Sequence, residues 1–446
     1  MMDGQSQPTT GQAHRMDEHT LAEVARAGTQ FNAVTAMTDE RANALTAESM
    51  KRAGSGQPPR RLEGIPFAIK DVIDVAGYPT TMGSKVSLAE AAATSAPTVT
   101  VLEEAGAIPV AKTNCQEYSY GILGDESAFG RVINPVDPVL CTAGSSSGSA
   151  ALVAAGAVPL ALGTDTAGSV RVPAACQGVF GFKPSFGTVP VDGVFPLSPA
   201  FDTVGLFASD LGLLATAFDV IAGAESEAHA AAGVPDGIAS GIGRTGRTID
   251  VSLLGDRANR ALDLLTEVPN LTVTSVNGQA LSELLDACAP IYEFIRLYEA
   301  FQVHRDLFAA HAADYQPGVA KKIEAGRNLT EADYRQQLNA LADLREQAQR
   351  IFATTDFLLT PAIDGPVIRW DEIDSGSAAK FMRYSMPFNV LGWPALTIPL
   401  PNGGFARGGS AHDGSDARTA ERPRAVQLVG RPGADRALLA FASRLG

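Results

Sequence analysis

The chain has 446 residues, of which 45% are apolar and 19% are charged, a composition typical of a soluble globular protein. Its 35 basic and 49 acidic side chains give a net charge of −14, which disfavours binding to nucleic acid and to anionic membranes. The N-terminal stretch lacks the apolar core of a secretory signal, and no segment reaches the roughly 18 apolar residues that a membrane helix needs. We therefore expect a cytoplasmic protein with neither nucleic acid nor a membrane as a partner.

The cysteines give no sign of a metal site. Cys115, Cys141, Cys176 and Cys288 have neither a C-x-x-C spacing nor histidines at zinc-ligand intervals. This pattern predicts free thiols in a reducing compartment. No residue pattern in the chain implies a metal or an organic cofactor.

The N-terminal part predicts a tail, a helix and then a buried strand. Residues 1–20 are polar and rich in Gln, Thr and Gly, which predicts a flexible tail before a helix at Leu21–Ala27. The run Ile65–Ile69 is apolar and β-type. It predicts a strand that delivers Lys70 and Asp71 at its end.

Further along, helices and strands alternate. A helix is predicted at Thr98–Glu104 and a strand at Ile108–Lys112. The Ala-rich segment from Ser147 predicts a serine-capped helix, and Leu160–Leu162 predicts a strand that ends at Gly163. This alternation indicates an α/β sheet.

The C-terminal half contains two glycine-rich segments, Gly233–Arg247 and Gly403–Arg424, which predict surface excursions, the second a flexible loop. Between them, Thr330–Phe352 predicts a long helix with Thr330 as N-cap and an acidic residue three positions later. A strand is predicted to follow at Phe357–Leu359.

Two turns of small residues enclose one helix and one strand. Ala143–Ser149 reads AGSSSGS, and Gly163–Arg171 reads GTDTAGSVR. Glycine lets backbone N–H groups approach a ligand closely, and successive N–H groups can bind an anion. Turns of this kind therefore have the composition that an oxyanion hole requires.

Two general interpretations of the first turn are weak. A phosphate-binding loop would need a lysine after Gly148, and none is present. A nucleophile elbow with Ser146 as nucleophile would need a strand directly before it, where the chain has two prolines. It would also need a downstream histidine, and His229, His304, His311 and His412 lie in linkers or a polar helix.

Lys70 is the candidate base of a histidine-free serine hydrolase. It lies between Ala68-Ile69 and Val72-Ile73, an apolar surrounding that disfavours an ammonium ion and lowers the lysine pKa. Taken alone, such a lysine more often marks a strand end and reaches out to water. Only its combination with the two turns favours a catalytic role.

The combined pattern closely resembles the amidase-signature family. The matching segments are Gly64–Asp71, Ala111–Asn114 with Glu117, Ala143–Ala151, Gly163–Pro184, and Pro387–Asn389 with Gly392–Ala395. The resemblance implies an α/β fold, a single large domain over residues 21–446 with a central mixed β-sheet surrounded by helices.

The resemblance also implies the site residues. Ser169 would be the nucleophile, Ser145 the bridging serine on a cis peptide bond, and Lys70 the base. The spacing of 24 between Ser145 and Ser169 is the one that the family shows, which favours Ser145 over Ser146 as the bridge. The backbone amides of Thr166, Ala167, Gly168 and Ser169 would form the oxyanion hole, with Ser146, Asp165 and Arg171 in supporting roles.

The sequence departs from the family at two places. Ala143 and Ala167 stand where the family more often has glycine, and alanine is compatible with either position if its φ is negative. Cys176 would lie near the site in a packing role.

These residues predict hydrolysis of a carboxamide C–N bond, through a Ser169 acyl-enzyme, to an acid plus ammonia or an amine. Two alternatives stay open: a glutaminase-like subunit of a tRNA-dependent amidotransferase, and an α/β-hydrolase-like esterase that uses Ser146. Retention of Lys70, Ser145 and Ser169 argues against a non-catalytic relative. The acidic chain and its glycine-rich C-terminal region favour a self-contained hydrolase.

The expected partner is a small-molecule amide, and a homodimer is compatible with the sequence. Aromatic residues in the predicted pocket loops Tyr118–Phe129, Phe195–Phe201 and Phe381–Tyr384 favour an apolar or aryl acyl group.

Overall fold

The computed structural model describes residues 15–86, 90–223, 249–253, 271–275, 278–400 and 425–445. The predicted tail at 1–20 falls mostly outside these residues. The predicted excursions at 233–247 and 403–424 fall wholly outside them.

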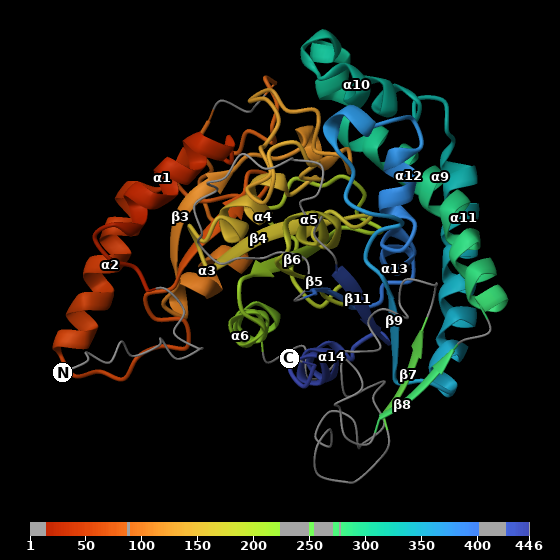
Figure 1. Ribbon diagram of the computed structural model, residues 1–446. Helices are drawn as coiled ribbons and strands as arrows, with labels where there is room; N and C mark the ends of the chain where they lie inside the picture. The colour runs from red at the N-terminus through yellow and green to blue at the C-terminus, as the bar shows by residue number, and fades with distance from the viewer. Residues whose placement is uncertain are drawn as a thin grey trace.

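A mixed sheet of eleven strands runs through the described part of the chain (Figure 1). From one edge to the other, the strands are β1 (Val34–Met37), β3 (Ile108–Thr113), β2 (Pro66–Lys70), β4 (Leu160–Asp165), β6 (Thr203–Ala208), β5 (Phe180–Lys183), β10 (Ala395–Pro399), β11 (Ala425–Gly430), β9 (Phe357–Pro361), β7 (Ile249–Leu253) and β8 (Leu271–Ser275). Strand β2 pairs in parallel with β3 and β4, and β7 with β8 and β9, whereas the other neighbours are antiparallel. The predicted fold class, an α/β domain around a mixed sheet, is confirmed.

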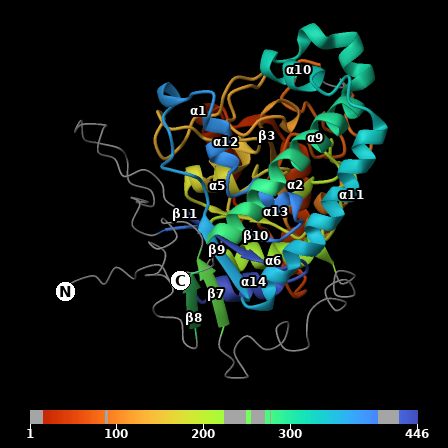
Figure 2. The same ribbon diagram turned by 90° about the vertical axis from the view of Figure 1, so that its right-hand side faces the viewer.

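Helices cover both faces of this sheet. One face carries α1 (Thr20–Phe31), α4 (Ser147–Ala154) and α5 (Arg171–Gln177), and the other carries α3 (Pro97–Glu104), α6 (Leu211–Ala222) and α14 (Asp435–Ala442). Helix α2 (Asp39–Gly54) packs on β3. Figure 2 looks onto the remaining group, α9 (Gly278–His311), α10 (Pro317–Glu324), α11 (Glu331–Ala348), α12 (Ser377–Met382) and α13 (Met386–Val390).

Side-chain alternation along β2 explains where Lys70 points. Phe67 and Ile69 belong to the apolar cluster under α3 and α6, whereas Ala68 belongs to the cluster under α1 and α4. Successive side chains of a strand point to opposite faces. Lys70 therefore continues the row of Ala68, on the face where α4 begins.

Most predicted elements are present. The predicted helices at 21–27 and 98–104 lie within α1 and α3, and the one at 330–352 lies largely within α11. The predicted strands lie within or overlap β2, β3, β4 and β9. The N-cap prediction for Thr330 is confirmed, since its hydroxyl accepts a hydrogen bond from the Asp333 amide. The serine cap of α4 is wrong. The Ser146 hydroxyl forms hydrogen bonds with the backbone of Thr164 and none with a helix amide, because the turn packs on β4.

The four cysteines are free, as predicted, and the structure shows that all four are buried. Within the described ranges, no helix has the length and apolar character to cross a bilayer.

Candidate active site

Lys70 lies at the end of β2, and its side chain is completely buried. Its Nζ donates hydrogen bonds to Oγ of Ser145, at 2.7 Å, and to Oγ1 of Thr164, at 2.6 Å. Both partners are neutral hydroxyls. The structure thus brings the predicted base into direct contact with the predicted bridging serine.

Burial changes the protonation of this lysine. Loss of hydration lowers the pKa of Lys70 from 10.5 to about 8, although the nearby Cys115, Asp202 and Asp165 act in the opposite direction. A lysine with this pKa has a far larger neutral fraction near neutral pH than an ordinary lysine with a pKa of 10.5. An amine at hydrogen-bond distance from a hydroxyl can then accept its proton.

The Ser145 turn precedes α4 and has an unusual backbone. The Gly144–Ser145 peptide bond is cis, as the resemblance implied, and Ala143 has a φ of 56°. Two backbone hydrogen bonds hold the turn against residues 116–122: Gln116 N donates to Ser145 O, and Gly144 N donates to Ile122 O. The condition of negative φ therefore fails at Ala143, which occupies the left-handed region at some conformational cost.

Ser169 lies in the loop between β4 and α5, next to the serine turn. Its carbonyl oxygen accepts a hydrogen bond from the Ser146 amide at 3.4 Å, and its side chain is largely buried. Gly168 before it has a φ of 123°, and a Cβ there would clash with Oγ of Ser385. The loop thus needs glycine at 168, whereas Ala167 is not among the residues with positive φ.

Asp165 and Arg171 hold this loop in shape. Their side chains are fully buried and form an ion pair at 2.9 Å, and the Asp165 carboxylate also accepts hydrogen bonds from the Gly168 and Val170 amides. Burial alone would raise the pKa of Asp165, but the charge and hydrogen bonds of Arg171 hold it well below its ordinary value. The carboxylate therefore stays ionised and fixes the loop backbone.

The four predicted oxyanion-hole amides differ in their partners. Gly168 N donates to Oδ1 of Asp165 at 2.7 Å, so it is already engaged. In the described part of the chain, the amides of Thr166, Ala167 and Ser169 have no hydrogen-bond acceptor. These three N–H groups are free to donate to a substrate oxygen.

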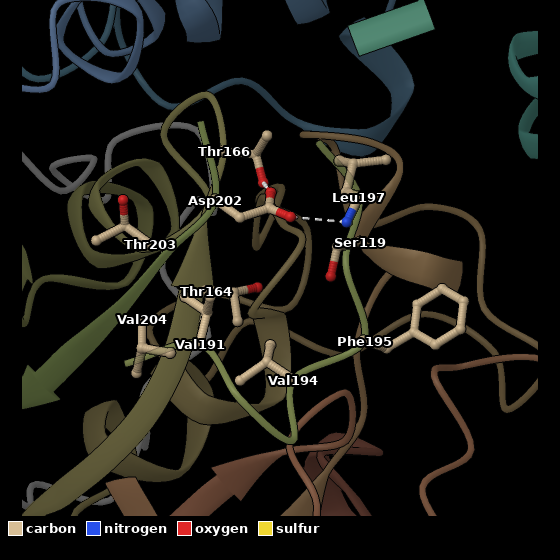
Figure 3. A pocket seen from close by; sticks show the side chains of 10 residues that line it. All are labelled: Ser119, Thr164, Thr166, Val191, Val194, Phe195, Leu197, Asp202, Thr203 and Val204. Atoms are coloured by element: carbon tan, nitrogen blue, oxygen red, sulfur yellow. Dashed lines mark hydrogen bonds between the residues drawn. The ribbon is translucent and has the colours of Figure 1, made fainter. Parts of the chain in front are cut away.

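A small pocket is lined by Thr164, the second hydrogen-bond partner of Lys70. Figure 3 shows the side chains that line this pocket. Thr164, Thr166, Ser119 and Asp202 supply its polar wall, and Val191, Val194, Phe195, Leu197, Thr203 and Val204 complete the lining. The Asp202 carboxylate accepts hydrogen bonds from the Thr166 hydroxyl, at 2.6 Å, and from two loop amides. Asp202 therefore links the loop between β4 and α5 to the pocket wall.

Sequence reasoning missed several residues of the site. Thr164 is the second partner of Lys70, and no local pattern indicated it, because the contact depends on the parallel pairing of β2 with β4. Asn389, Ser385 and Gln427 accept hydrogen bonds from Arg171 and complete its buried shell. Asn389 lies in a segment that carried the family resemblance, but Gln427 had no signal in the sequence.

The alternative nucleophile, Ser146, is fully buried and bonded on both sides. Its Oγ donates to Thr164 O and accepts from Thr164 N. No strand precedes the turn, and no histidine in the described ranges hydrogen-bonds to Ser145, Ser146 or Ser169. His304 instead contacts Tyr315, and burial lowers its pKa to about 4. This geometry does not fit a nucleophile elbow.

Cys176 is fully buried in an apolar cluster with Cys141 and Val172, which agrees with the predicted packing role. Burial raises the pKa of its thiol well above the ordinary value, so it stays protonated.

Comparisons with known proteins give a matching family model, similar sequences and similar solved structures. The family model Amidase matches residues 17–439. A glutamyl-tRNA(Gln) amidotransferase subunit from Koribacter versatilis is 30% identical over 424 residues, which cover 86% of each chain. The AtzE subunit of 1-carboxybiuret hydrolase from Pseudomonas sp. (strain ADP) is 31% identical over 404 residues, again 86% of each. A solved amidase structure superposes with a TM-score of 0.77 and 29% identity, covering 96% of this chain and 94% of the other.

Proposed function

This chain belongs to the amidase family of enzymes that hydrolyse amide C–N bonds, and we propose that it is a self-contained amidohydrolase. It cuts a carboxamide to an acid plus ammonia or an amine, with Ser169 as nucleophile, Ser145 as bridge and Lys70 as base. The observation that carries the proposal is the contact between the fully buried Nζ of Lys70 and Oγ of Ser145 at 2.7 Å.

In the first half of the reaction, Ser169 attacks the substrate carbonyl carbon. Its hydroxyl proton passes to Ser145 while the Ser145 proton passes to neutral Lys70, which becomes an ammonium. The proton then returns through Ser145 to the leaving nitrogen, and the C–N bond breaks. An acyl-enzyme on Ser169 remains, and water repeats the sequence to release the acid.

The developing oxyanion is stabilised by the loop between β4 and α5. The amides of Thr166, Ala167 and Ser169 carry this role, since they have no acceptor among the described residues. The Gly168 amide contributes less because it already donates to Asp165. Asp165 and Arg171 support the site by holding the loop, and Ser146 does so by tying the serine turn to β4.

A second candidate function is the glutaminase subunit of a tRNA-dependent amidotransferase, in which released ammonia would pass to a partner protein. It is favoured by the 30% identity to the amidotransferase subunit from Koribacter versatilis. The net charge of −14 fits a free hydrolase better. The two candidates differ in whether the purified chain alone hydrolyses simple amides.

The test is ammonia release by the purified chain from a panel of aliphatic, aryl and ureido amides and glutamine. We expect turnover of at least one simple amide without a partner, and loss of this turnover in Ser169→Ala with the fold intact by circular dichroism. Near-normal turnover in Ser169→Ala would contradict the assignment. Activity with glutamine alone, and only after addition of amidotransferase partner subunits, would favour the second candidate.

A further inference from the structure

Residues 116–124 lie directly against the serine turn and lead away from it toward α9. Backbone hydrogen bonds join Gln116 to Ser145 and Ile122 to Gly144. Within this segment, Tyr118 and Ser119 have φ values of 49° and 60°. Left-handed non-glycine residues are costly and are found mainly where a function requires them.

Two hydroxyls of this segment are buried without a partner. Oγ of Ser119 and Oη of Tyr120 have no hydrogen-bond partner among the residues that the structure describes. Their residues are only 5% and 2% exposed. Ser119 also lines the pocket beside Thr164 and Thr166 (Figure 3). A buried hydroxyl without a partner costs stability, so a ligand group is the natural acceptor.

Arg296 of α9 lies over this segment. Its guanidinium packs on the ring faces of Tyr120, at 5.3 Å, and of Tyr292, at 5.1 Å. Across the described ranges, its Nε has no hydrogen-bond partner, and its ion pair is a long contact of 3.8 Å to the largely exposed Glu293. A guanidinium cannot lose its charge, and the Arg296 side chain is only 15% exposed, so this partly buried cation has its nearest carboxylate at 3.8 Å.

Lys322 of α10 is a second cation at Tyr120. Its Nζ lies 5.6 Å from the Tyr120 ring centre and donates to the Tyr120 carbonyl oxygen. Burial and the charge of Arg296 lower the pKa of Lys322, against the opposing charges of Glu126 and Asp125. The Glu126 carboxylate lies 3.7 Å from Nζ and is also engaged by the Gly318 amide. The negative charge of Glu126 therefore offsets the charge of Lys322 and not that of Arg296.

Tyr292, on which Arg296 packs, extends these contacts to the loop between β4 and α5. The Tyr292 ring packs on Phe201 at 5.4 Å, and both belong to one apolar cluster with Ala167. Asp202, which follows Phe201, anchors Thr166. Ser119, Tyr120, Tyr292 and Arg296, here called the Arg296 cluster, thus connect the serine turn with the nucleophile loop.

We propose that the Arg296 cluster is a subsite for a carboxylate on the acyl part of the substrate, a specificity that rests on the proposed amidohydrolase function. The guanidinium fork supplies charge-assisted hydrogen bonds to the carboxylate, and the Tyr120 hydroxyl supplies another. Tyr120 is one of the aromatic residues that from sequence favoured an apolar or aryl group, and here the guanidinium packs on its ring and on that of Tyr292.

Binding tests the subsite without turnover. The Ser169→Ala variant is titrated by calorimetry with succinamate, glutaramate and adipamate, and with the uncharged butyramide, pentanamide and hexanamide of matching length. We expect at least one carboxylated amide to bind more tightly than its neutral match. Adding Arg296→Gln weakens that binding about tenfold to 100-fold and leaves the neutral amide within about twofold.

Arg305→Gln in the same Ser169→Ala background is the matched control, because Arg305 is a 63% exposed arginine of the same helix. Its effect on both amides should be within about twofold. Tyr120→Phe, which keeps the ring and removes the unpartnered hydroxyl, should weaken the carboxylated amide alone by about threefold to tenfold.

The subsite is overturned if Ser169→Ala binds carboxylated and neutral amides equally, or if Arg296→Gln weakens both to the same extent. Ammonia release by the parent chain from neutral amides only would likewise overturn it while the amidohydrolase proposal stands. Selective binding through Arg296 with no ammonia release from any amide would support the subsite and contradict the proposed function.

Discussion

Lys70 and Lys112 lie one position out of register on the neighbouring parallel strands β2 and β3, and both are fully buried, yet their partners differ. Lys112 pairs with the Asp71 carboxylate at 2.8 Å and donates to the Thr80 hydroxyl. Among the residues that the structure describes, the hydrogen-bond partners of Lys70 are only the hydroxyls of Ser145 and Thr164. A carboxylate stabilises an ammonium, whereas hydroxyl partners also suit a neutral amine. Burial alone therefore does not mark a base, and the partners separate a structural lysine from a proton acceptor.

The largest expected effect is on Lys70. Lys70→Ala should lower kcat about 10³-fold or more, because general-base catalysis of this kind contributes up to about 10⁴-fold. Lys70→Arg should not restore activity, since a guanidinium stays protonated and cannot accept the Ser145 proton. Steady-state kinetics on folded protein measures both. Restoration by arginine would mean that position 70 requires only a positive charge.

Lys112 should behave in the opposite way. Lys112→Met leaves the buried Asp71 carboxylate without its cation, which should reduce the free energy of unfolding by about 3–5 kcal/mol. Below the melting transition, kcat should stay within about tenfold of the parent. Urea unfolding beside kinetics separates the two quantities, and Lys112→Met with Asp71→Asn should recover part of the stability. Unchanged stability with activity as low as in Lys70→Ala would erase the contrast between the lysines.

The pH dependence sharpens the same comparison. The pKa of Lys70 is lowered to about 8, and only the neutral amine accepts a proton. As pH falls below about 8, Lys70 becomes protonated, so kcat/KM should fall about tenfold per pH unit, and it should level off above that pH. The profile of the parent is compared with those of His304→Gln, His311→Gln and His412→Gln. An acid limb that moves in any of these variants would identify a histidine as the base.

The smallest effect concerns the two alanines that replace family glycines. Ala143 has a φ of 56°, whereas Ala167 is not among the residues with positive φ. Ala167→Gly should lower stability by about 0.5–1 kcal/mol through backbone entropy, whereas Ala143→Gly should be neutral or slightly stabilising because it removes the Cβ penalty. Urea midpoints of the two variants measure this difference. The reverse order would contradict the assigned backbone conformations.

The sequence predicted the part of the molecule that is written in local patterns. The strand before Lys70, the helix after Ser147 and the Thr330 cap follow from apolar runs and capping residues, and they are present. The small-residue turns, through the family resemblance, named Lys70, Ser145 and Ser169 before any geometry was known. Their roles stay predictions until they are measured.

What the sequence could not give depends on contacts between distant segments. Thr164 reaches Lys70 only because β4 pairs with β2, and Gln427 meets Arg171 only because β11 lies close to α5. Ala143 has a left-handed φ in a turn that hydrogen-bonds to residues 116–122, a contact that no local pattern specifies. Arg296 had no motif, and its position over Tyr120 is set by the path of α9.

The central claim is that Ser169 forms the covalent intermediate while Ser145 and Ser146 do not. The direct measurement is peptide mapping by mass spectrometry after the chain is trapped with an acylating inhibitor or quenched during turnover. The account predicts a single acyl adduct on Ser169, formed at a reduced rate in Ser146→Ala and absent in Ser169→Ala. An adduct on Ser146 that persists in Ser169→Ala would contradict it and favour the α/β-hydrolase mechanism.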